Sequence, residues 1–507
     1  MSENTTNAKK GQFRINRANK LRTLYSDEES LQRRLDEVSR SDALLYHNAK
    51  EVRKVLRDAV INRDSIVKVS NLLYAVNPIY AQIINYLSNM FLWRYKVTPH
   101  KVFRNSKVKD AKDVEEAEYL RLYHLMLEVV DGLSIETKFP SILTYLFISG
   151  GVYLTTFFDE ETYALNTILL SAKYCRKIGD TQYGTAIISF DFSFFDDVGK
   201  NQEERDLILS SYPKEFRRNY AAYERDHKSQ QARWRELDPR FSSGLLLNDQ
   251  AIPTEFYLYS SLLDYEQYQD NELERNENLL KYVIVQTVPH YEDKLIFEVD
   301  EVQAMQQSLE RKLAVNKNVR VATTYGDIPV ERIAEDETTA NEVLDKSYKT
   351  IFNNGGFNSA LFNGESVQAL NYSILRDRSQ VWRYVSALTN FYTIALNNYL
   401  DFKNYQLDIE ILPISSYTFN DDINTYRQNA TLGVGRLDFM IASGIKQKNI
   451  EDTLKLEKIL KLEEIKPMQT SYTQTASDRD ASVESRTSTE TSSSSESAEK
   501  SEKDAQR

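Results

Sequence analysis

Residues 337–364 read ETTANEVLDKSYKTIFNNGGFNSALFNG, and residues 365–401 continue as ESVQALNYSILRDRSQVWRYVSALTNFYTIALNNYLD. The second segment contains no Gly or Pro, and its apolar residues recur at gaps of three, four or seven, which indicates one apolar helix face. We expect Asp377 and Arg378 to interrupt that face. A helix of this length spans roughly 50–55 Å, so it must cross a large domain or pack against neighbouring subunits. The apolar positions are Val367, Leu370, Ile374, Val381, Val385, Leu388, Tyr392, Ala395 and Tyr399.

Two glycines, Gly355 and Gly356, separate this long helix from the helix predicted over residues 337–353. One interpretation is a glycine C-cap that ends the first helix. The other is a hinge, since glycine adopts positive φ at no steric cost, and the loop up to Gly364 is then held out between two helices for a purpose. Both interpretations stay open at this point.

The composition is typical of a soluble protein with a large core, with 507 residues, 41% hydrophobic and 27% charged. The 32 Tyr and 22 Phe residues suit broad contact surfaces between subunits as well as ordinary cores. Cys175 is the only cysteine, which excludes a disulfide within the chain and a cysteine-rich zinc site. We therefore expect an intracellular product, or one indifferent to redox conditions, without a secretory signal in its polar N-terminus.

Residues 139–158 form the longest stretch without a formal charge. It is rich in Ser, Thr and Gly, whereas a membrane-spanning helix needs about 20 predominantly apolar residues. We expect a buried helix up to Ile148, a turn at Gly150-Gly151 and a strand over 152–158, and no membrane segment.

The charge distribution argues against tight binding of nucleic acid, because the chain carries a net charge of −11 and such binders show a basic footprint. The exception is a basic, flexible N-terminal arm, residues 1–24. Such a run is usually solvated, although it can also touch phosphate or an acidic partner. Its basic residues are Lys9, Lys10, Arg14, Arg17, Lys20 and Arg22.

Periodicity and turn residues predict the order of the remaining elements. A small βαβ-like module is expected between two helices, which suggests a domain carried on a two-helix stalk. The C-terminal segment, Ser/Thr/Glu-rich, cannot bury enough apolar surface to fold. The expected helices are 26–39, 42–59, 79–91, 113–131, 203–238 with a break at Pro213, 256–287, 300–315, 337–353, 365–401, one after Asn420, and 449–464 with Ile450, Leu454 and Leu460 inward. The expected strands are 93–98, 152–158, 167–170, 187–195, 294–299, 319–325 and 407–412. The helix predicted over 300–315 is expected to carry Val302, Met305, Leu309 and Leu313 on its inner face.

Motifs for catalysis are absent from the sequence: there is no phosphate-binding loop, no nucleophile elbow and no His-Glu-x-x-His spacing. Asp191, Asp196 and Asp197 can be weighed as ligands of a divalent metal in a nuclease. Asp191 alternates with phenylalanines, however, which favours the solvated face of a strand. Cys175, flanked by cations, is more typical of a small packed residue than of a nucleophile. We expect no enzyme, no cofactor and no metal.

The order of elements and a set of short stretches resemble the portal proteins of tailed double-stranded DNA bacteriophages, the head–tail connectors. The resemblance covers most of residues 25–467, and no single stretch is diagnostic. The stretches are Asn77-Pro78-Ile79-Tyr80, Lys173-Tyr174-Cys175-Arg176, Phe190-Asp191-Phe192, Phe297-Glu298-Val299-Asp300-Glu301, Gly355-Gly356 with Leu361-Phe362-Asn363-Gly364, and Ser443-Gly444-Ile445-Lys446-Gln447.

The resemblance implies an α+β, mainly helical portal fold and a homo-oligomeric ring, commonly of twelve subunits. That ring would form a channel at one capsid vertex for DNA packaging and ejection, in a virion assembled in the host cytoplasm. The implied parts are the wing (25–255), stem helix 1 (256–287), the clip (288–334), stem helix 2 (335–354), the tunnel loop (355–366), the long helix and its return to the wing (367–420), the crown (421–467) and a disordered tail (468–507).

The resemblance also implies partners and site residues. The partners are further copies of this chain, the major capsid protein, scaffold, the terminase large subunit, head–tail adaptor and tail proteins, and the double-stranded DNA in the channel. Gly355 and Gly356 would be the hinge of the tunnel loop. The residues expected to face DNA are Lys346, Lys349, Asn353, Asn354, Phe357, Asn358 and Asn363. The residues expected to dock the motor and the adaptor are Arg311, Lys312, Asn316, Lys317, Asn318 and Arg320.

Two alternatives remain beside the portal interpretation. The first is another structural connector of a capsid or tail, which forms oligomers but has no DNA channel. The second is a metal-dependent nuclease that uses Asp191, Asp196 and Asp197.

Overall fold

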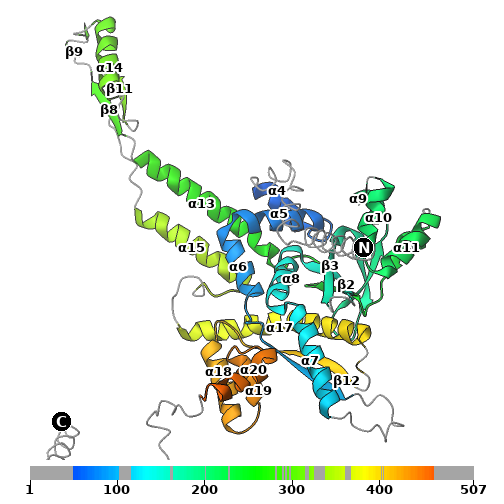
Figure 1. Ribbon diagram of the computed structural model, residues 1–507. Coiled ribbons are helices and arrows are strands. Elements are labelled where there is room, and N and C mark those ends of the chain that lie inside the picture. Colours follow the sequence, from blue (N-terminus) through cyan, green and yellow to red (C-terminus); the bar gives the residue numbers. More distant parts are fainter. Residues whose placement is uncertain are drawn as a thin grey trace, which may run out of the picture. The chain divides into compact units, whose positions relative to one another are not determined.

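The computed structural model of the chain shows an α+β protein that is mainly helical, as the sequence predicts (Figure 1). Contacts divide the chain into two units, Met1–Gln447 and Lys448–Arg507. The structure describes residues 49–101, 116–159, 164–199, 201–226, 229–279, 282–287, 290–291, 294–295, 298–313, 319–324, 337–359, 367–400, 402 and 405–461. The N-terminal arm, the predicted helix over 26–39 and the predicted tail 468–507 lie outside these residues.

The first part of the chain is helical. Asn77 caps α6, since its Oδ1 accepts a hydrogen bond from the Tyr80 backbone N–H at 2.9 Å, and Pro78 occupies the first helical position. The predicted helix over 79–91 is thus confirmed, although it ends three residues early, and α5 was not predicted. The helices are α4 (Ala49–Arg57), α5 (Arg63–Val76), α6 (Pro78–Ser88), α7 (Glu116–Gly132) and α8 (Ile135–Ser149).

The turn predicted at Gly150-Gly151 is confirmed. Gly150 ends α8 with φ +76°, and a Cβ there would lie 2.4 Å from the carbonyl carbon of Ile252. Both the left-handed backbone and the close approach require glycine. The buried α8 helix therefore passes directly into strand β2, as the glycine pair predicts.

A six-stranded antiparallel sheet follows, in the order β3-β2-β7-β5-β4 with β6 on β5. The strand predicted over 187–195 ends at Asp191, because the Asp191 carboxylate accepts the Ser193 backbone N–H at 3.0 Å and turns the chain into a helix. Strand β4 was not predicted. The strands are β2 (Gly151–Asp159), β3 (Ala164–Leu170), β4 (Cys175–Asp180), β5 (Ala186–Asp191), β6 (Trp234–Glu236) and β7 (Ser242–Leu246).

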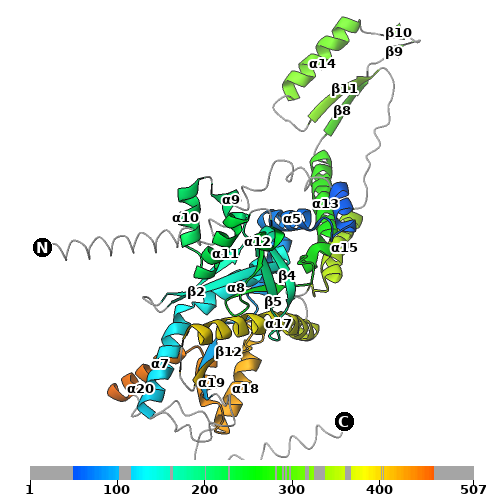
Figure 2. The same ribbon diagram turned by 90° about the vertical axis from the view of Figure 1, so that its right-hand side faces the viewer.

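The long helical segment predicted over 203–238 is divided into shorter pieces and ends in a strand, β6. Proline at position 213 stands before the second piece, where a residue without a backbone N–H is tolerated. The pieces are α10 (Gln202–Ser210), α11 (Lys214–Arg225) and α12 (Gln230–Arg233), and the short helix α9 (Phe194–Val198) precedes them. They lie beside the sheet in both views (Figure 2).

Two helices, α13 and α15, flank a small α/β module in the sequence. The predicted helix over 256–287 is wrong at both ends: a 3-10 turn stands first, and residues 282–287 form strand β8, where Tyr282 to Val285 favour an extended chain. Strand β8 pairs with β11 in parallel, and α14 makes the crossover, so the βαβ arrangement is correct but its first strand was misplaced. The elements are η2 (Thr254–Tyr257), α13 (Leu258–Leu279), β8 (Tyr282–Thr287), β9 (His290–Tyr291), β10 (Lys294–Leu295), α14 (Val299–Leu313), β11 (Val319–Thr324) and α15 (Glu337–Gly355).

The long helix is α17 (Val367–Tyr399), which has 33 residues. Most of its predicted apolar face is buried. The predicted interruption is wrong, since Asp377 is also buried, with 1% of its side chain exposed. Met305 of α14, predicted to be inward, is exposed. The buried positions of the predicted face are Ile374, Val381, Val385, Leu388, Tyr392 and Ala395.

Strand β12 (Tyr405–Ile411) returns from α17 and pairs with β1 (Tyr95–Lys101) in an antiparallel ladder. Helices α18 (Phe419–Thr431) and α19 (Arg436–Ala442), the turn η3 (Gln447–Asn449) and α20 (Ile450–Ile459) follow. Ile450 of α20 is buried, as predicted, whereas Leu454 of α20 and Leu460, which follows the helix, are exposed.

Two hydrophobic cores hold the first unit together. The larger core joins α5, α6, α8 and α17 to the start of α13 and the end of α15. The smaller core is aromatic and lies between the sheet and helices α9 to α11, around Phe190, Phe192, Phe195 and Phe216.

Arg378 fixes α18 to the long helix. Its Nη1 donates to Asp422 Oδ1 at 2.9 Å and to Thr418 Oγ1 at 3.2 Å, and its Nη2 donates to the Pro413 carbonyl oxygen. The Arg378 and Asp422 side chains are 17% and 16% exposed. A partly buried charge pair of this kind is costly to break, because the remaining charge stays desolvated.

We therefore expect Arg378→Met to lower the free energy of unfolding by about 3 kcal/mol, measured by urea denaturation. The matched control is Arg427→Met, because Arg427 is exposed on α18 and should change stability by less than about 0.5 kcal/mol. Equal losses for the two variants would contradict the assigned role of Arg378.

Candidate functional site

The candidate site is the end of α15, where the chain leaves the α13–α15 pair. The two helices run antiparallel: Asn354 Nδ2 donates to Ser261 Oγ at 3.1 Å, and the Tyr265 and Tyr348 rings lie 6.0 Å apart. At this end the pair is buried in the main core through Leu258, Leu262, Ile351 and Phe352. The position of Asn354 at the end of α15 is therefore fixed by α13.

Gly355 and Gly356 end α15 as a C-cap. The Phe357 backbone N–H bonds to the Phe352 carbonyl at 2.8 Å, the Gly356 N–H bonds to the Asn353 carbonyl at 3.1 Å, and Gly356 has φ +71°. These two bonds and the left-handed residue define a Schellman motif. The C-cap interpretation is confirmed. The hinge interpretation of Gly355 and Gly356 stays a prediction, and any hinge motion there would have to open this hydrogen-bonded cap.

Gly355 is required by packing rather than by freedom of rotation. A Cβ at this position would lie 2.7 Å from the Phe357 ring and 3.0 Å from Leu258 Cδ2. These distances are shorter than ordinary van der Waals contact, so any side chain would displace its neighbours.

Phe357 follows the cap and is buried, with 9% of its surface exposed. Its ring meets the Tyr86 ring edge-on at 6.4 Å. The expectation that Phe357 faces DNA is therefore wrong. The residue after a Schellman cap commonly makes the hydrophobic contact that accompanies the motif, and Phe357 does so here.

Arg376 links the cap to the long helix. Its Nη2 donates to the Gly356 carbonyl oxygen, and its Nε and Nη2 donate to Asp377 Oδ1 at 3.1 and 2.8 Å. Tyr86 of α6 donates its hydroxyl to Asp377 Oδ2 at 3.1 Å. Burial raises the pKa of Asp377 although Arg376 and Tyr86 oppose that shift. The C-cap of α15, α17 and α6 thus meet at one polar cluster, in which Asp377 is buried and Arg376 is half exposed.

The other residues expected to face DNA fall into three groups. Lys346, Lys349 and Asn353 are exposed on one side of α15. Asn354 is exposed but bonded to α13, and Asn358 is half-buried. Asn363 lies outside the described residues.

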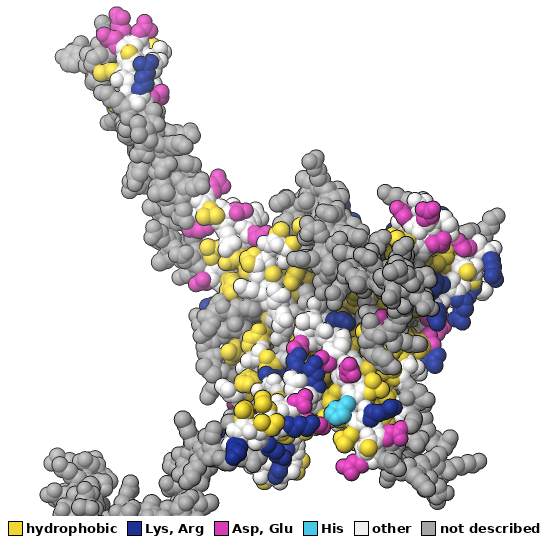
Figure 3. Space-filling model, viewed as in Figure 1, with side chains coloured by type: hydrophobic (Ala, Val, Ile, Leu, Met, Phe, Trp, Pro, Cys, Tyr) yellow, Lys and Arg dark blue, Asp and Glu magenta, His cyan; other side chains and the backbone are white. Residues whose placement is uncertain are grey.

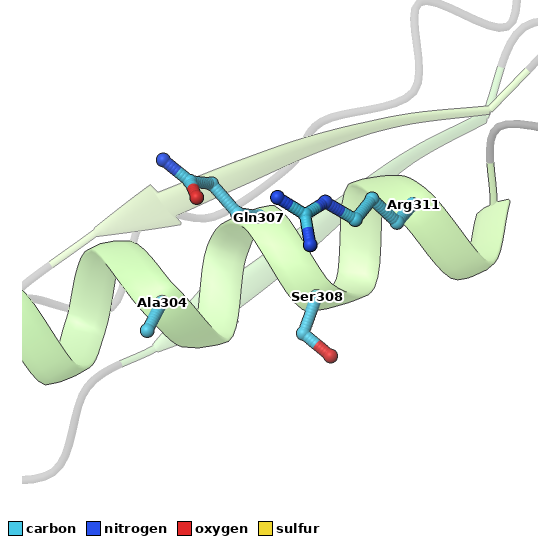
Figure 4. A pocket seen from close by; sticks show the side chains of 4 residues that line it. All are labelled: Ala304, Gln307, Ser308 and Arg311. Atoms are coloured by element: carbon cyan, nitrogen blue, oxygen red, sulfur yellow. The ribbon is translucent and has the colours of Figure 1, made fainter.

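Of the expected docking residues, Arg311 is exposed on α14. Together with Ala304, Gln307 and Ser308 it lines an open pocket of about 340 Å³ (Figure 4). Lys312 belongs to α14 and Arg320 to β11, but their side chains lie outside those described, as do Asn316, Lys317 and Asn318 altogether.

The acids weighed as metal ligands are already paired with protein donors. Asp191 is buried, not solvated as expected, because Arg233 donates to both its oxygens at 2.8 to 3.0 Å. Burial alone would raise the pKa of Asp191, but the hydrogen bonds from Arg233 and Ser193 outweigh it and lower the pKa.

Asp196 and Asp197 have different partners from Asp191. Asp196 accepts hydrogen bonds from Arg205, Tyr220 and Tyr223, at 2.8 to 3.1 Å. Asp197 accepts from Tyr174 at 2.6 Å. In the part of the chain that the structure describes, no group of three or more His, Cys, Asp or Glu side chains is arranged to hold a metal ion.

Cys175 is buried, as the packing interpretation predicts, and burial raises the pKa of its thiol far above the ordinary value. Among the described helices, none combines the length and the apolar character needed to cross a lipid bilayer. A scan against known protein families finds no match to this chain, and no curated protein matches it.

We expect Gly355→Ala to lower the free energy of unfolding by about 1–3 kcal/mol, since the added methyl group overpacks the contact with Phe357 and Leu258. Urea denaturation measures the change. The matched control is Gly132→Ala in α7, because no atom lies within 4 Å of the added Cβ. A neutral Gly355→Ala variant would favour a loose hinge over a packed cap.

The lowered pKa of Asp191 predicts a dependence of stability on pH. The ionised carboxylate stabilises the fold above its ordinary unfolded pKa of about 4, and this contribution is lost as the pH falls through the lower folded pKa. Asp191→Asn should therefore cost about 2 kcal/mol at pH 7 and flatten the acid limb of the stability profile. The control is Asp206→Asn on the exposed face of α10, and an unchanged acid limb in Asp191→Asn would refute the assignment.

Proposed function

We propose that this chain is the portal protein of a tailed double-stranded DNA bacteriophage. In this proposal about twelve copies form a ring at one capsid vertex, and the ring is the channel through which DNA is packaged and later ejected. The role is structural rather than enzymatic, since DNA movement would be driven by a separate terminase.

The observation that carries the proposal is the arrangement around α15. An antiparallel helix pair holds a small βαβ module between its two helices in the sequence, and the second helix ends in a buried cap followed by the 33-residue helix α17. A portal subunit needs the same three parts: a stem, a clip between its helices, and a long helix that starts beside the tunnel loop.

The cap supports a specific start for the tunnel loop. Backbone hydrogen bonds fix the chain through Phe357, so the loop that approaches DNA would begin after that residue rather than at Gly355. The overall charge of −11 per chain suits a channel that repels phosphate and does not hold the moving DNA.

The module supports a docking role for the clip. Arg311 borders an open pocket with the small residues Ala304 and Ser308, so a partner's carboxylate can reach the guanidinium without a steric barrier. In the proposal this surface meets the terminase large subunit during packaging and a head–tail adaptor afterwards, while the rest of the ring contacts the major capsid protein and scaffold.

A connector that forms a ring without a DNA channel shares the same subunit contacts. It differs in its central opening, which needs no loop to line it. The nuclease alternative has no supporting observation, because each of its three acids is already bonded to Arg or Tyr donors.

We expect electron microscopy of the purified protein to show rings of about a dozen subunits with a central hole, and mass photometry to give the matching mass. A portal ring must also admit a duplex, so the hole should be wide enough for B-form DNA. A chain that remains monomeric at all concentrations contradicts the ring, and rings without an adequate hole favour the connector.

A further inference from the structure

The helix pair α13–α15 carries opposite charges on its two outer sides. Leu258, Ser261 and Tyr265 turn toward α15, as shown by their contacts with Gly355, Asn354 and Tyr348. At about 100° per residue, the opposite side of the helix lies half a turn away. That side of α13 carries Gln267, Asp270 and Glu274.

The outer side of α15 is basic. Tyr348, Phe352 and Gly355 face α13 or the core. The same rule for helices places the exposed residues Lys346 and Asn353 on the side away from α13, and Lys349 at the edge of that side, about 90° from the α13-facing direction. Asp345 is also exposed and lies closer to the side that faces α13.

The charges on these two sides are free of described partners. Arg53 pairs with Asp264, and Asn77 bonds to Glu266, both nearer to the main core. Asp270 and Glu274 are exposed, stand four residues apart, and form no ion pair among the described residues; Lys346 and Lys349 form none either. Like charges at this spacing on a helix destabilise it, so each side gains from a partner of opposite charge.

The described side chains of α13, residues 258–274, include five acids and no Lys or Arg. Acidic side chains are visible along the coloured part of this helix in Figure 3. The antiparallel contacts between Ser261 and Asn354 and between Tyr265 and Tyr348 also place Asp270 opposite the turn of α15 that carries Lys346. The acidic pair therefore lies about five residues, or roughly 8 Å, farther along the helix pair than the two lysines.

We propose that the basic outer side of α15 binds the acidic outer side of α13 on the next copy of this chain. Closed rings are built from head-to-tail contacts, in which two different surfaces of each copy must be complementary. A helix pair with an acidic side and a basic side meets that requirement, and the offset of about five residues between the two patches is met by a tilt of the helix pair relative to its neighbour. The inference rests on the proposed ring and names the contact that would close it.

This assignment replaces the expectation that Lys346 and Lys349 face DNA. Basic residues that line a channel grip phosphate, and such contacts weaken steeply with salt. Paired with acids of the neighbouring copy, the same lysines are neutralised, and DNA in the channel meets no fixed cations from α15.

The test uses two charge reversals in the full-length chain, Lys346→Glu/Lys349→Glu and Asp270→Lys/Glu274→Lys. Each variant alone brings like charges together at every contact of the ring. We expect each to raise the protein concentration at which half of the chains are in rings by at least tenfold, measured by mass photometry in about 0.1 M salt, where charges up to about 10 Å apart interact.

An equimolar mixture of the two variants should restore the rings. In an alternating ring every α15 of one variant meets an α13 of opposite charge on the other variant. A single chain that carries all four substitutions should also assemble. This rescue distinguishes a specific contact from misfolding, since two misfolded chains cannot restore each other.

The matched control is Arg217→Glu/Arg218→Glu, which makes the same change in net charge at two exposed positions of α11 and should leave assembly unchanged. Rings that form normally from both reversed variants overturn the contact but not the ring. If the Lys346→Glu/Lys349→Glu variant still forms rings but DNA no longer passes through them, Lys346 and Lys349 face the channel and not the neighbouring copy. A wild-type chain that never forms rings overturns the proposed function and this contact with it.

Discussion

The carbonyl oxygen of Gly356 is the point on which the arrangement of α13, α15 and α17 depends. A helix end leaves backbone carbonyls without intrahelical partners, and a side-chain donor can satisfy them. Arg376 satisfies this one and is itself held by Asp377, which has 1% of its side chain exposed. Because Tyr86 donates to the same carboxylate, the end of the helix pair, the long helix and α6 are fixed to one another by a single polar contact.

The buried ends of α13 and α15, which form the base of the helix pair, differ from the exposed outer sides of the same two helices. Phe352 and Phe357 anchor α15 in the main core, and Asn354 bonds to α13. The base of the helix pair is therefore held by packing and by hydrogen bonds through Phe357. The charged sides of α13 and α15 lie away from this base. In the isolated chain they lower helix stability only slightly, through repulsion between like charges on the same helix. Stability and recognition are thus assigned to different sides of the same two helices.

The sequence predicts the elements whose signals are local and strong. The apolar period of α17, the Asn77-Pro78 start of α6 and the glycine at the end of α8 all act within one or two turns. Strand β8 was missed because Tyr282 to Val285 form a short apolar run, and such a run fits the end of a buried helix as well as a strand. It is the parallel partner β11, about forty residues later in the chain, that makes them a strand. Asp377 was expected to interrupt the apolar face because it is charged, and Phe357 was expected to face DNA because of the resemblance to portal proteins. The residue that contacts both, Tyr86, lies far away in sequence.

The three acids around the sheet show why a list of residue types does not establish a catalytic site. Asp191, Asp196 and Asp197 lie within seven positions, yet each has its own set of donors: Arg233; Arg205 with two tyrosines; and Tyr174. The donor to Asp191 joins the sheet to α12, the donors to Asp196 join α9 to α10 and α11, and a metal at either carboxylate would have to displace them. On α13 the arrangement is the reverse, since Asp270 and Glu274 are exposed with no described cation beside them. The buried Asp191 therefore has its partner within the fold, whereas the charge of Asp270 and Glu274 stays on the surface among the described residues and is open to contact with other molecules.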